Sequence, residues 1–394
     1  MSPRYGTEVV GGAERLARML ALSLHGAGWD VEVLTTCARD AATWRNREPA
    51  GESSDEGVRV RRFPVRMARR PGLFHQFSRG FFRLPPGARP ETLWALAQGP
   101  WSPGLVEAVR TMPPLPTLFL PYLYHPTLRG LPACPGPRLL MPAAHDELPL
   151  RLRSVAEAVA AAGALWYATD EERELVERAH PAAAGKPWAV GNVGIDAPVA
   201  AQLDPGRFRA AHAAELGEAP YLLYGGRVAT GKGMEDLLDG LRLLHRHRGD
   251  VRLVLTGEAG ALTPPGDGVV PVGRLDEASR WDALAGAAAV VVPSFHESLS
   301  LLALEAWAVG RPVLANAASP VLLGQVQRSR GGVAYRGAEE LAQAAADLLA
   351  GPDVATSLGQ SGQRYVEQTY RWELVHARLE GLIAQATAAS AARR

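Results

Sequence analysis

The feature that most constrains the fold is the alternation of apolar, strand-like runs with helical patterns along the whole chain. The first half contains the runs DVEVLTT, VRVRRF, PTLFLPYLY, PRLLMPAAHD and ALWYATD, separated by helical or loop segments. The rhythm then restarts with YLLYGGR, VRLVLTGE, VVPVG, AAVVVPS and RPVLANA. Strands that alternate with helices are typical of parallel α/β sheets. Two such series predict two doubly wound, Rossmann-like domains.

Length and composition agree with this class. The 394 residues leave room for two or three domains, and 47% hydrophobic and 21% charged residues are ordinary for a globular protein. No apolar run reaches the roughly 18 residues of a membrane span, and the first residues do not resemble a secretion signal. A net charge of +1 gives no overall attraction to nucleic acid. Cys37 and Cys134 lack metal-type spacing. We expect a cytoplasmic protein.

The boundary between the two domains is predicted in AVGNVGIDAPV, where two glycines and a proline interrupt the alternation of strands and helices. The predicted parts are an N-terminal domain of residues 1–193, a C-terminal domain of residues 194–370, and a final segment of residues 371–394. Doubly wound domains begin with an apolar strand before the first glycine-rich loop, and MSPRYGTEVVGG has none. Either Val9–Val10 is a weak substitute or the true start lies upstream, and we favour an incomplete N-terminus.

Two glutamates mark the stretch HESLSLLALEAWAVGRPVLA, where Glu297 and Glu305 are eight positions apart. On one helix they would be separated by about 12 Å of rise, wider than the roughly 5 to 9.5 Å of a glycosidase pair. The helix dipole accounts for a glutamate in the first turn without any function. It does not account for Glu305 among leucines, because an unpaired buried charge is strongly unfavourable. Two carboxylates that hold different parts of one polar ligand fit better.

A glycine-rich loop in YGGRVATGKGMEDLLDGL carries Gly226, Arg227 and Lys232 at the start of a helix. Glycines admit close backbone approach, and helix N–H groups with two cations suit a diphosphate. The spacing G-x-x-x-x-G-K-[ST] is absent, which excludes the nucleoside-triphosphatase loop. Two solvated loop cations are the alternative. Against it, Lys232 is one of only two lysines among 42 basic residues.

Two weaker patterns complete the candidate site. Gly11 and Gly12 open the first helix in VVGGAERL, although paired glycines before a helix are common. PAAHDELPLRL presents His145 and Asp146 after a strand, although a lone histidine is more often structural.

The motifs GGAE, GNVGID, GRVATGKG and PSFHESLSLLALEAWAVGRPVLA occur in the order seen in family-four glycosyltransferases, and the chain resembles this family from Tyr5 onward. The resemblance implies the B-type fold, in which two facing Rossmann-like domains enclose the active site in an interdomain cleft and the last helix crosses back to the first domain. It implies a retaining, metal-independent enzyme without further cofactors. The donor would be a nucleotide-diphosphate sugar of UDP or GDP type, and a hexosyl or hexosaminyl group would move to an acceptor hydroxyl.

The resemblance also implies roles for individual residues. Glu305 would bind the ribose hydroxyls and Glu297 the transferred sugar, while Arg227 and Lys232 would hold the diphosphate. The family commonly has Glu-Gly-Phe-Gly-Leu where this chain has Glu-Ser-Leu-Ser-Leu, and the added side chains narrow the sugar pocket. The other implied donor contacts, backbone groups apart from one histidine, are Gly11, Gly12, His145, Gly226, Arg274, Leu275, Ser298, Leu299, Ser300 and Leu301.

The acceptor leaves fewer traces. Tyr122 and Tyr124 in PYLYHP could stack on an acceptor ring, and Asp146 could bind its hydroxyls. Residues 57–84 carry eight arginines, five phenylalanines and no acid. This segment is either a solvated insertion or a site for an anionic acceptor or an anionic membrane, at the inner face of the membrane.

Three other functions compete with the glycosyltransferase. A nucleotide-sugar epimerase can share the fold. A nicotinamide oxidoreductase would need G-x-G-x-x-G after a strand, and there is no clean copy. A non-catalytic scaffold would have little reason to keep Arg227, Lys232, Glu297 and Glu305 together.

Overall fold

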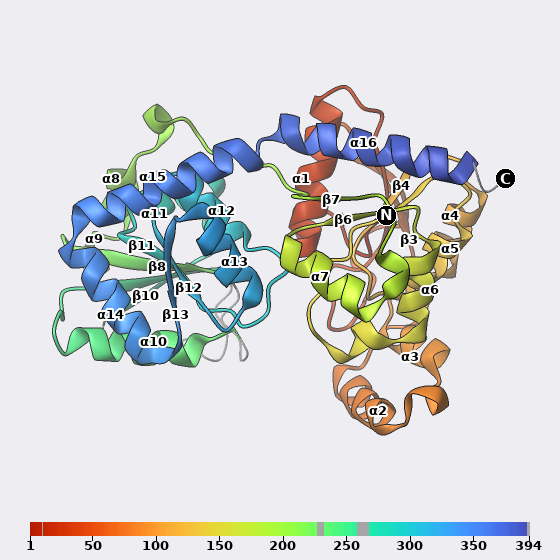
Figure 1. Ribbon diagram of the computed structural model, residues 1–394, viewed down its shortest axis with the longest axis horizontal. Helices are drawn as coiled ribbons and strands as arrows, with labels where there is room; N and C mark the ends of the chain where they lie inside the picture. Colours follow the sequence, from red (N-terminus) through yellow and green to blue (C-terminus); the bar gives the residue numbers. More distant parts are fainter. Residues whose placement is uncertain (10, 227–231, 258–267, 392–394) are drawn as a thin grey trace. The chain divides into compact units, whose positions relative to one another are not determined.

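The computed structural model describes residues 1–9, 11–226, 232–257 and 268–391 (Figure 1). It divides the chain into two compact units. Unit 1 comprises Met1–Gly194 and Trp372–Arg394, and unit 2 comprises Ile195–Arg371. The predicted joints, at residues 193 and 370, each lie one residue from these boundaries.

Unit 1 contains two sheets. One has the strand order β1-β3-β2, and the other is parallel with the order β4-β5-β6-β7. Strand β3 pairs in parallel with β1, and β2 runs antiparallel along its other side. The strands are β1 (Glu32–Thr36), β2 (Gly51–Asp55), β3 (Val58–Phe63), β4 (Thr117–Phe119), β5 (Arg138–Leu140), β6 (Ala164–Tyr167) and β7 (Trp188–Val190).

The first three residues connect these two sheets. The Met1 amine donates to the Leu118 carbonyl in β4 at 2.7 Å, and the Ser2 N–H donates to the Leu34 carbonyl in β1 at 3.1 Å. Residues 1–3 therefore lie between β1 and β4, where a doubly wound domain has its first strand. Val9, the described half of the predicted substitute Val9–Val10, is buried but belongs to no strand.

Helices cover the sheets of unit 1, and the C-terminal helix is one of them. It packs against β5, β6 and β7. A Cβ atom on Gly194 would lie 2.3 Å from the Trp372 ring, so the chain fits tightly where this helix begins. The α-helices are α1 (Gly12–Gly26), α2 (Pro71–Arg83), α3 (Glu91–Gln98), α4 (Pro103–Thr111), α5 (His125–Ala133), α6 (Arg153–Ala161), α7 (Asp170–Ala179) and α16 (Trp372–Ala391).

Unit 2 is a single parallel sheet with helices packed on it. Its strand order, β10-β9-β8-β11-β12-β13, reverses direction between β8 and β11. The strands are β8 (Tyr221–Gly225), β9 (Arg252–Thr256), β10 (Val269–Gly273), β11 (Ala289–Val292), β12 (Val313–Asn316) and β13 (Gly332–Tyr335). The α-helices are α8 (Pro205–Ala211), α9 (Ala213–Leu216), α10 (Met234–His245), α11 (Glu277–Gly286), α12 (Leu301–Ala308), α13 (Pro320–Ser329), α14 (Gly337–Ala350) and α15 (Pro352–Thr369).

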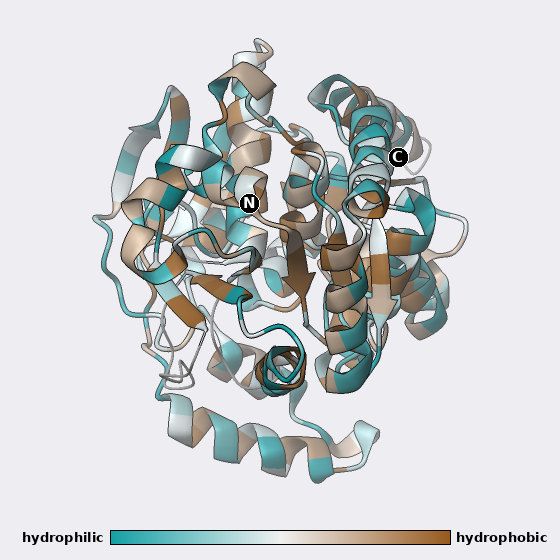
Figure 2. Ribbon diagram, turned by 90° about the vertical axis from the view of Figure 1, so that its left-hand side faces the viewer, coloured by the Kyte–Doolittle hydropathy of each residue, from teal (hydrophilic) through white to brown (hydrophobic). Residues whose placement is uncertain are grey.

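The hydropathy pattern explains this architecture. Strands β8, β11 and β12 are buried along almost their whole length, as expected for parallel strands covered on both faces. Figure 2 shows hydrophobic strands inside and hydrophilic residues along the outer helices. Within the described ranges, no helix has the length and apolarity needed to cross a bilayer. The predicted class of two parallel, Rossmann-like α/β domains is confirmed.

Candidate functional site

The loops that follow β8 and β11 touch each other at the strand reversal of unit 2, the usual ligand edge of such sheets. Gly233, just before α10, has a φ of +73°, and a Cβ atom there would lie 2.0 Å from the carbonyl oxygen of Pro293. Pro293 directly follows β11. Only glycine permits this contact, which brings the end of the β8 loop against the segment that leads to α12.

Lys232 and Glu297 meet at this contact. The Lys232 Nζ donates to the Glu297 Oε1 at 3.2 Å, and the two side chains are 41% and 20% exposed. They come from two different sequence motifs, on the loops of neighbouring strands. Gly226, at the start of the same loop, is exposed, and the predicted second cation, Arg227, lies outside the described residues. The edge therefore combines a lysine and a carboxylate that both remain accessible.

Helix α12 begins later than the sequence indicated. Ser300 is its N-cap, and its Oγ accepts the N–H of Ala303 at 3.2 Å, so the helix starts at Leu301. Glu297 precedes the helix and is not in its first turn. The expectation that Glu297 and Glu305 share one helix, with about 12 Å of rise between them, is wrong. The reason is that the Ser300 hydroxyl caps the helix, so the residues before Ser300 are not helical.

Glu305 has a partner that sequence reasoning missed. Its Oε2 forms an ion pair with the Arg280 Nη1 at 2.6 Å, and the two side chains are 4% and 22% exposed. The Arg280 guanidinium also lies 4.6 Å from the centre of the neighbouring Trp281 ring. A buried carboxylate among leucines needs a compensating cation. The position of Glu305 among leucines in the sequence was therefore the signal that such a partner exists. Helix α11 thus supplies the cation for the carboxylate on α12.

The remaining predicted contacts in unit 2 lie in the segments that precede α11 and α12. Arg274 is exposed and Leu275 is half-buried in the segment between β10 and α11. Ser298 and Leu299 lie in the non-helical segment before α12 and are half-buried. The Ser300 N–H donates to the Gln325 side chain at 3.3 Å, and that N–H is therefore engaged within the protein.

In unit 1, a buried ion pair shapes the predicted Gly11–Gly12 loop. The Glu14 Oε1 lies 2.6 Å from the Arg4 Nη2, and both side chains are buried. A Cβ atom on Gly11 would lie 2.0 Å from the Glu14 Oε2, whereas one on Gly12 would meet nothing within 4 Å. The packing around Gly11 therefore leaves no room for a side chain, whereas there is free space for one at Gly12.

A buried glutamate holds the turn that precedes His145. The two oxygens of Glu172 accept the N–H groups of Ala144 and Ala168, both at 2.6 Å. Burial raises the pKa of Glu172 from 4.5 to about 7, although the backbone N–H groups act in the opposite direction. His145 is half-buried and follows Ala144 directly. Glu172 therefore links the ends of β5 and β6 beneath the predicted histidine.

The predicted acceptor residues differ in accessibility. Tyr122 is 1% exposed and its hydroxyl donates to the Glu147 Oε1 at 2.8 Å, so its ring belongs to the core and cannot stack on an acceptor. The prediction that Tyr122 stacks on an acceptor is wrong because its side chain points into the core of unit 1. Tyr124 is half-buried, and its ring centre lies 5.1 Å from that of Trp44 in an edge-to-face arrangement. Asp146 is exposed and pairs with a neighbouring arginine at 2.6 Å.

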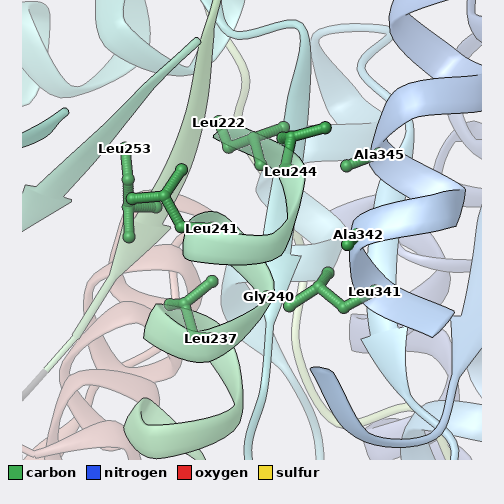
Figure 3. A pocket seen from close by; sticks show the side chains of 9 residues that line it. All are labelled: Leu222, Leu237, Gly240, Leu241, Leu244, Leu253, Leu341, Ala342 and Ala345. Atoms are coloured by element: carbon green, nitrogen blue, oxygen red, sulfur yellow. The ribbon is translucent and has the colours of Figure 1, made fainter. Parts of the chain in front are cut away.

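The core of unit 2 also contains an apolar pocket. The pocket between α10 and α14 is lined by leucine, alanine and glycine alone (Figure 3) and belongs to the core of unit 2. It offers no side-chain group for a polar ligand. In the part of the chain that the structure describes, no three His, Cys, Asp or Glu side chains are grouped to hold a metal ion. The polar edge with Lys232 and Glu297 is therefore the best candidate.

Comparison with known proteins identifies the family. Residues 219–351 match the family "Glycosyl transferases group 1", and residues 11–192 match "Glycosyl transferase 4-like domain". A D-inositol 3-phosphate glycosyltransferase of Segniliparus rotundus is 31% identical over 208 residues, which cover 48% of this chain and 45% of that protein. The chain spans about half the length of the curated relatives it matches.

Solved structures resemble the whole chain. Sucrose-phosphate synthase of Thermosynechococcus elongatus has a TM-score of 0.69 at 21% identity, covering 96% of this chain and 94% of the other. The Anabaena protein HepE in complex with UDP has a TM-score of 0.69 at 13% identity, covering 96% and 98%. At such identities the similarity establishes the fold, which is the B-type glycosyltransferase fold.

Proposed function

Because the chain belongs to the group 1 glycosyltransferase family, we propose that it is a retaining glycosyltransferase. It transfers a hexosyl or hexosaminyl group from a nucleotide-diphosphate sugar to an acceptor hydroxyl, without a metal ion. The observation that carries this proposal is the 3.2 Å contact between Lys232 and Glu297 at the strand reversal of unit 2. A cation for the diphosphate and a carboxylate for the sugar lie side by side there.

Transfer of the sugar requires stabilisation of the negative charge on the leaving group. Departure of the diphosphate leaves an oxocarbenium-like sugar, and negative charge develops on the phosphate oxygens. Lys232, with Arg227 and the N-terminal N–H groups of α12, supplies positive charge for those oxygens. In a same-face attack the leaving phosphate takes the acceptor proton, which requires no covalent enzyme intermediate.

The nucleotide and the sugar are assigned to different groups. Glu305 binds the ribose, Glu297 binds hydroxyls of the sugar, and the main chain at Arg274 and Leu275 meets the base. The glycine loop of unit 1 approaches the diphosphate and the acceptor, and His145 approaches the sugar. HepE, which shares the fold, is known in complexes with UDP and with UDP-glucose, and this supports UDP as the first donor nucleotide to test.

Nucleotide binding is the first test. Thermal unfolding of the chain is measured with UDP, GDP and ADP, beside a Glu305→Ala variant. A ligand at about 100 times its dissociation constant stabilises by about 2.7 kcal/mol, which raises the midpoint by a few degrees. A shift with one nucleotide that disappears in the variant supports the proposal, and the absence of any shift contradicts it.

Product analysis separates the remaining alternatives. Incubation with UDP-glucose and candidate acceptors should release UDP and form a glycoside that retains the anomeric configuration. An epimerase would instead convert one sugar into its epimer, and a non-catalytic scaffold would leave the donor intact. The acceptors to try first carry phosphate, because the curated relatives are named for D-inositol 3-phosphate.

The surface of α2 supports contact with an anionic membrane at its cytoplasmic face. The phenylalanines of this segment pack into unit 1: the Phe81 ring centre lies 5.8 Å from that of Trp94. Arg79 and Arg83 remain exposed, and Leu73 on the same helix is 58% exposed. Helix α2, drawn in orange in Figure 1, mixes hydrophilic with hydrophobic residues (Figure 2).

Vesicle binding tests this contact. The full chain should sediment with vesicles that contain anionic lipid and not with neutral vesicles. An Arg79→Glu, Arg83→Glu variant should lose this binding, whereas Arg242→Glu, an exposed position on unit 2, should keep it. Equal binding of both variants would contradict the role of α2.

A further inference from the structure

We infer that Arg280 is a positioning residue for the nucleotide ribose, because it fixes the Glu305 carboxylate in the orientation that accepts the ribose hydroxyls. This inference rests on the proposed function, in which Glu305 binds the ribose. It adds a residue of α11, five positions after the predicted base contact at Leu275.

Burial makes the pair with Arg280 necessary. Glu305 lies on α12 between Leu304 and Ala306, which are both fully buried. A carboxylate in such surroundings is strongly disfavoured unless a cation compensates it. Arg280 provides this cation at 2.6 Å.

The geometry of Arg280 also sets a direction. Its guanidinium lies 4.6 Å from the centre of the Trp281 ring, and Trp281 itself is buried, so both the plane and the position of the charge are restrained. The ion pair involves the Oε2 of Glu305. A carboxylate has about four acceptor sites, so hydroxyl donors can still bind to it. An acceptor that is already oriented loses less freedom when the ligand binds.

Helix α11 connects this pair to the predicted base contact. Asp276 caps the helix by accepting the N–H of Ser279 at 2.8 Å, and Leu275 comes directly before the cap. One turn later, Arg280 reaches Glu305. The base and the ribose would therefore be recognised through the two ends of the first turn of one rigid helix.

The same helix offers a matched control. Asp282 on α11 is 1% exposed, and its Oδ2 accepts the Nε of Arg207, from α8, at 2.6 Å. Removing Arg207 or Arg280 leaves a buried carboxylate without its arginine in either case. Each variant removes the arginine of a buried carboxylate, and only Arg280 acts on the carboxylate assigned to the ribose.

The test compares UDP with 2′,3′-dideoxy-UDP by isothermal titration in wild type, Arg280→Met, Arg280→Lys and Arg207→Met. The ratio of the two dissociation constants reports the ribose hydroxyls alone, because both probes share base and diphosphate. Wild type should prefer UDP roughly 10- to 100-fold, as expected for hydrogen bonds to a charged group. The ratio should fall to about threefold or less in Arg280→Met and stay at the wild-type value in Arg207→Met.

Each further outcome is decisive. A wild-type ratio in Arg280→Met overturns the inference, and so does an equal fall in Arg207→Met, which would indicate a structural effect. Arg280→Lys keeps the charge without the planar stacking and should give an intermediate ratio. If the methionine variant does not fold, a wild-type ratio in the lysine variant overturns the inference. If wild type binds neither UDP nor GDP nor ADP, the proposed function fails first; if it binds GDP or ADP, the comparison uses that nucleotide.

Discussion

Replacing Glu172 with glutamine should make the stability of unit 1 less dependent on pH. Glu172 is 1% exposed, and burial raises its pKa from 4.5 to about 7. Between these values the unfolded chain releases a proton that the folded chain retains. The stabilisation is therefore complete below pH 4.5 and lost as the pH rises to about 7. At about 1.36 kcal/mol per unit, the loss amounts to about 3 kcal/mol.

Urea denaturation of wild type and Glu172→Gln at about pH 5 and about pH 7.5 measures this effect. At the lower pH the variant should be less stable than wild type by about 1 to 3 kcal/mol. In wild type each side-chain oxygen accepts a backbone N–H, whereas in the variant one of these N–H groups faces the glutamine NH₂, which cannot accept it. At the higher pH the gap should shrink by about 2 to 3 kcal/mol, since wild type has lost its advantage. Contributions of other groups cancel in the difference. The same gap at both pH values would refute the reasoning.

The same variant should affect catalysis through the adjacent turn. Glu172 holds the N–H of Ala144, and His145 comes next. Displacing this turn should lower kcat, with the UDP dissociation constant unchanged, because the nucleotide is assigned to unit 2. Glu174→Gln, an exposed change on the same helix, should alter neither quantity.

Two further predictions concern the loops at the site. Lys232→Ala should lower kcat with UDP-glucose by roughly 100-fold or more and weaken UDP binding less, whereas Lys186→Ala, at the other lysine, should keep kcat; normal turnover of the Lys232 variant would contradict the mechanism. Gly11→Ala should lower the unfolding temperature, because its Cβ atom would lie 2.0 Å from the Glu14 Oε2, and Gly12→Ala, which meets nothing within 4 Å, should not. Equal melting temperatures of these two variants would exclude the predicted clash.

The apolar runs located most of the fold because buried parallel strands carry their own signal. AVVV and VLAN form β11 and β12 with every residue buried. Strand β2, with the sequence GESSD, was not predicted, since it is exposed and is held by its ladder to β3. The position of residues 1–3 between β1 and β4 was not predicted either. It depends on hydrogen bonds to strands far along the chain, which leave no local pattern.

The candidate site was predictable where function leaves unusual residues. Lys232 is one of only two lysines in the chain, and Glu305 is a charged residue among leucines. Arg280, the partner of Glu305, was harder to find because it is one of many arginines and lies on another helix, α11. Glu172 supports the turn before His145 from helix α7, and no sequence motif indicated it. Only tertiary packing shows which buried carboxylate has which partner.

The ion pairs Lys232–Glu297 and Arg280–Glu305 should differ in how they respond to the donor. Lys232 and Glu297 are 41% and 20% exposed, and an accessible pair contributes about 1 kcal/mol or less. Lys232 can therefore exchange its contact with Glu297 for one with a diphosphate at a small cost in free energy. Arg280 and Glu305 are mostly buried, so separating them is far more unfavourable, and this pair should stay intact.

Salt should separate these two contributions. Raising the ionic strength from about 0.05 to about 0.5 M screens exposed charges far more than buried ones. The affinity for UDP should fall relative to that for uridine, because the diphosphate depends on accessible cations. The preference of UDP over its dideoxy analogue should hold. If that preference falls as steeply as the diphosphate contribution, Arg280 and Glu305 do not act as a fixed pair.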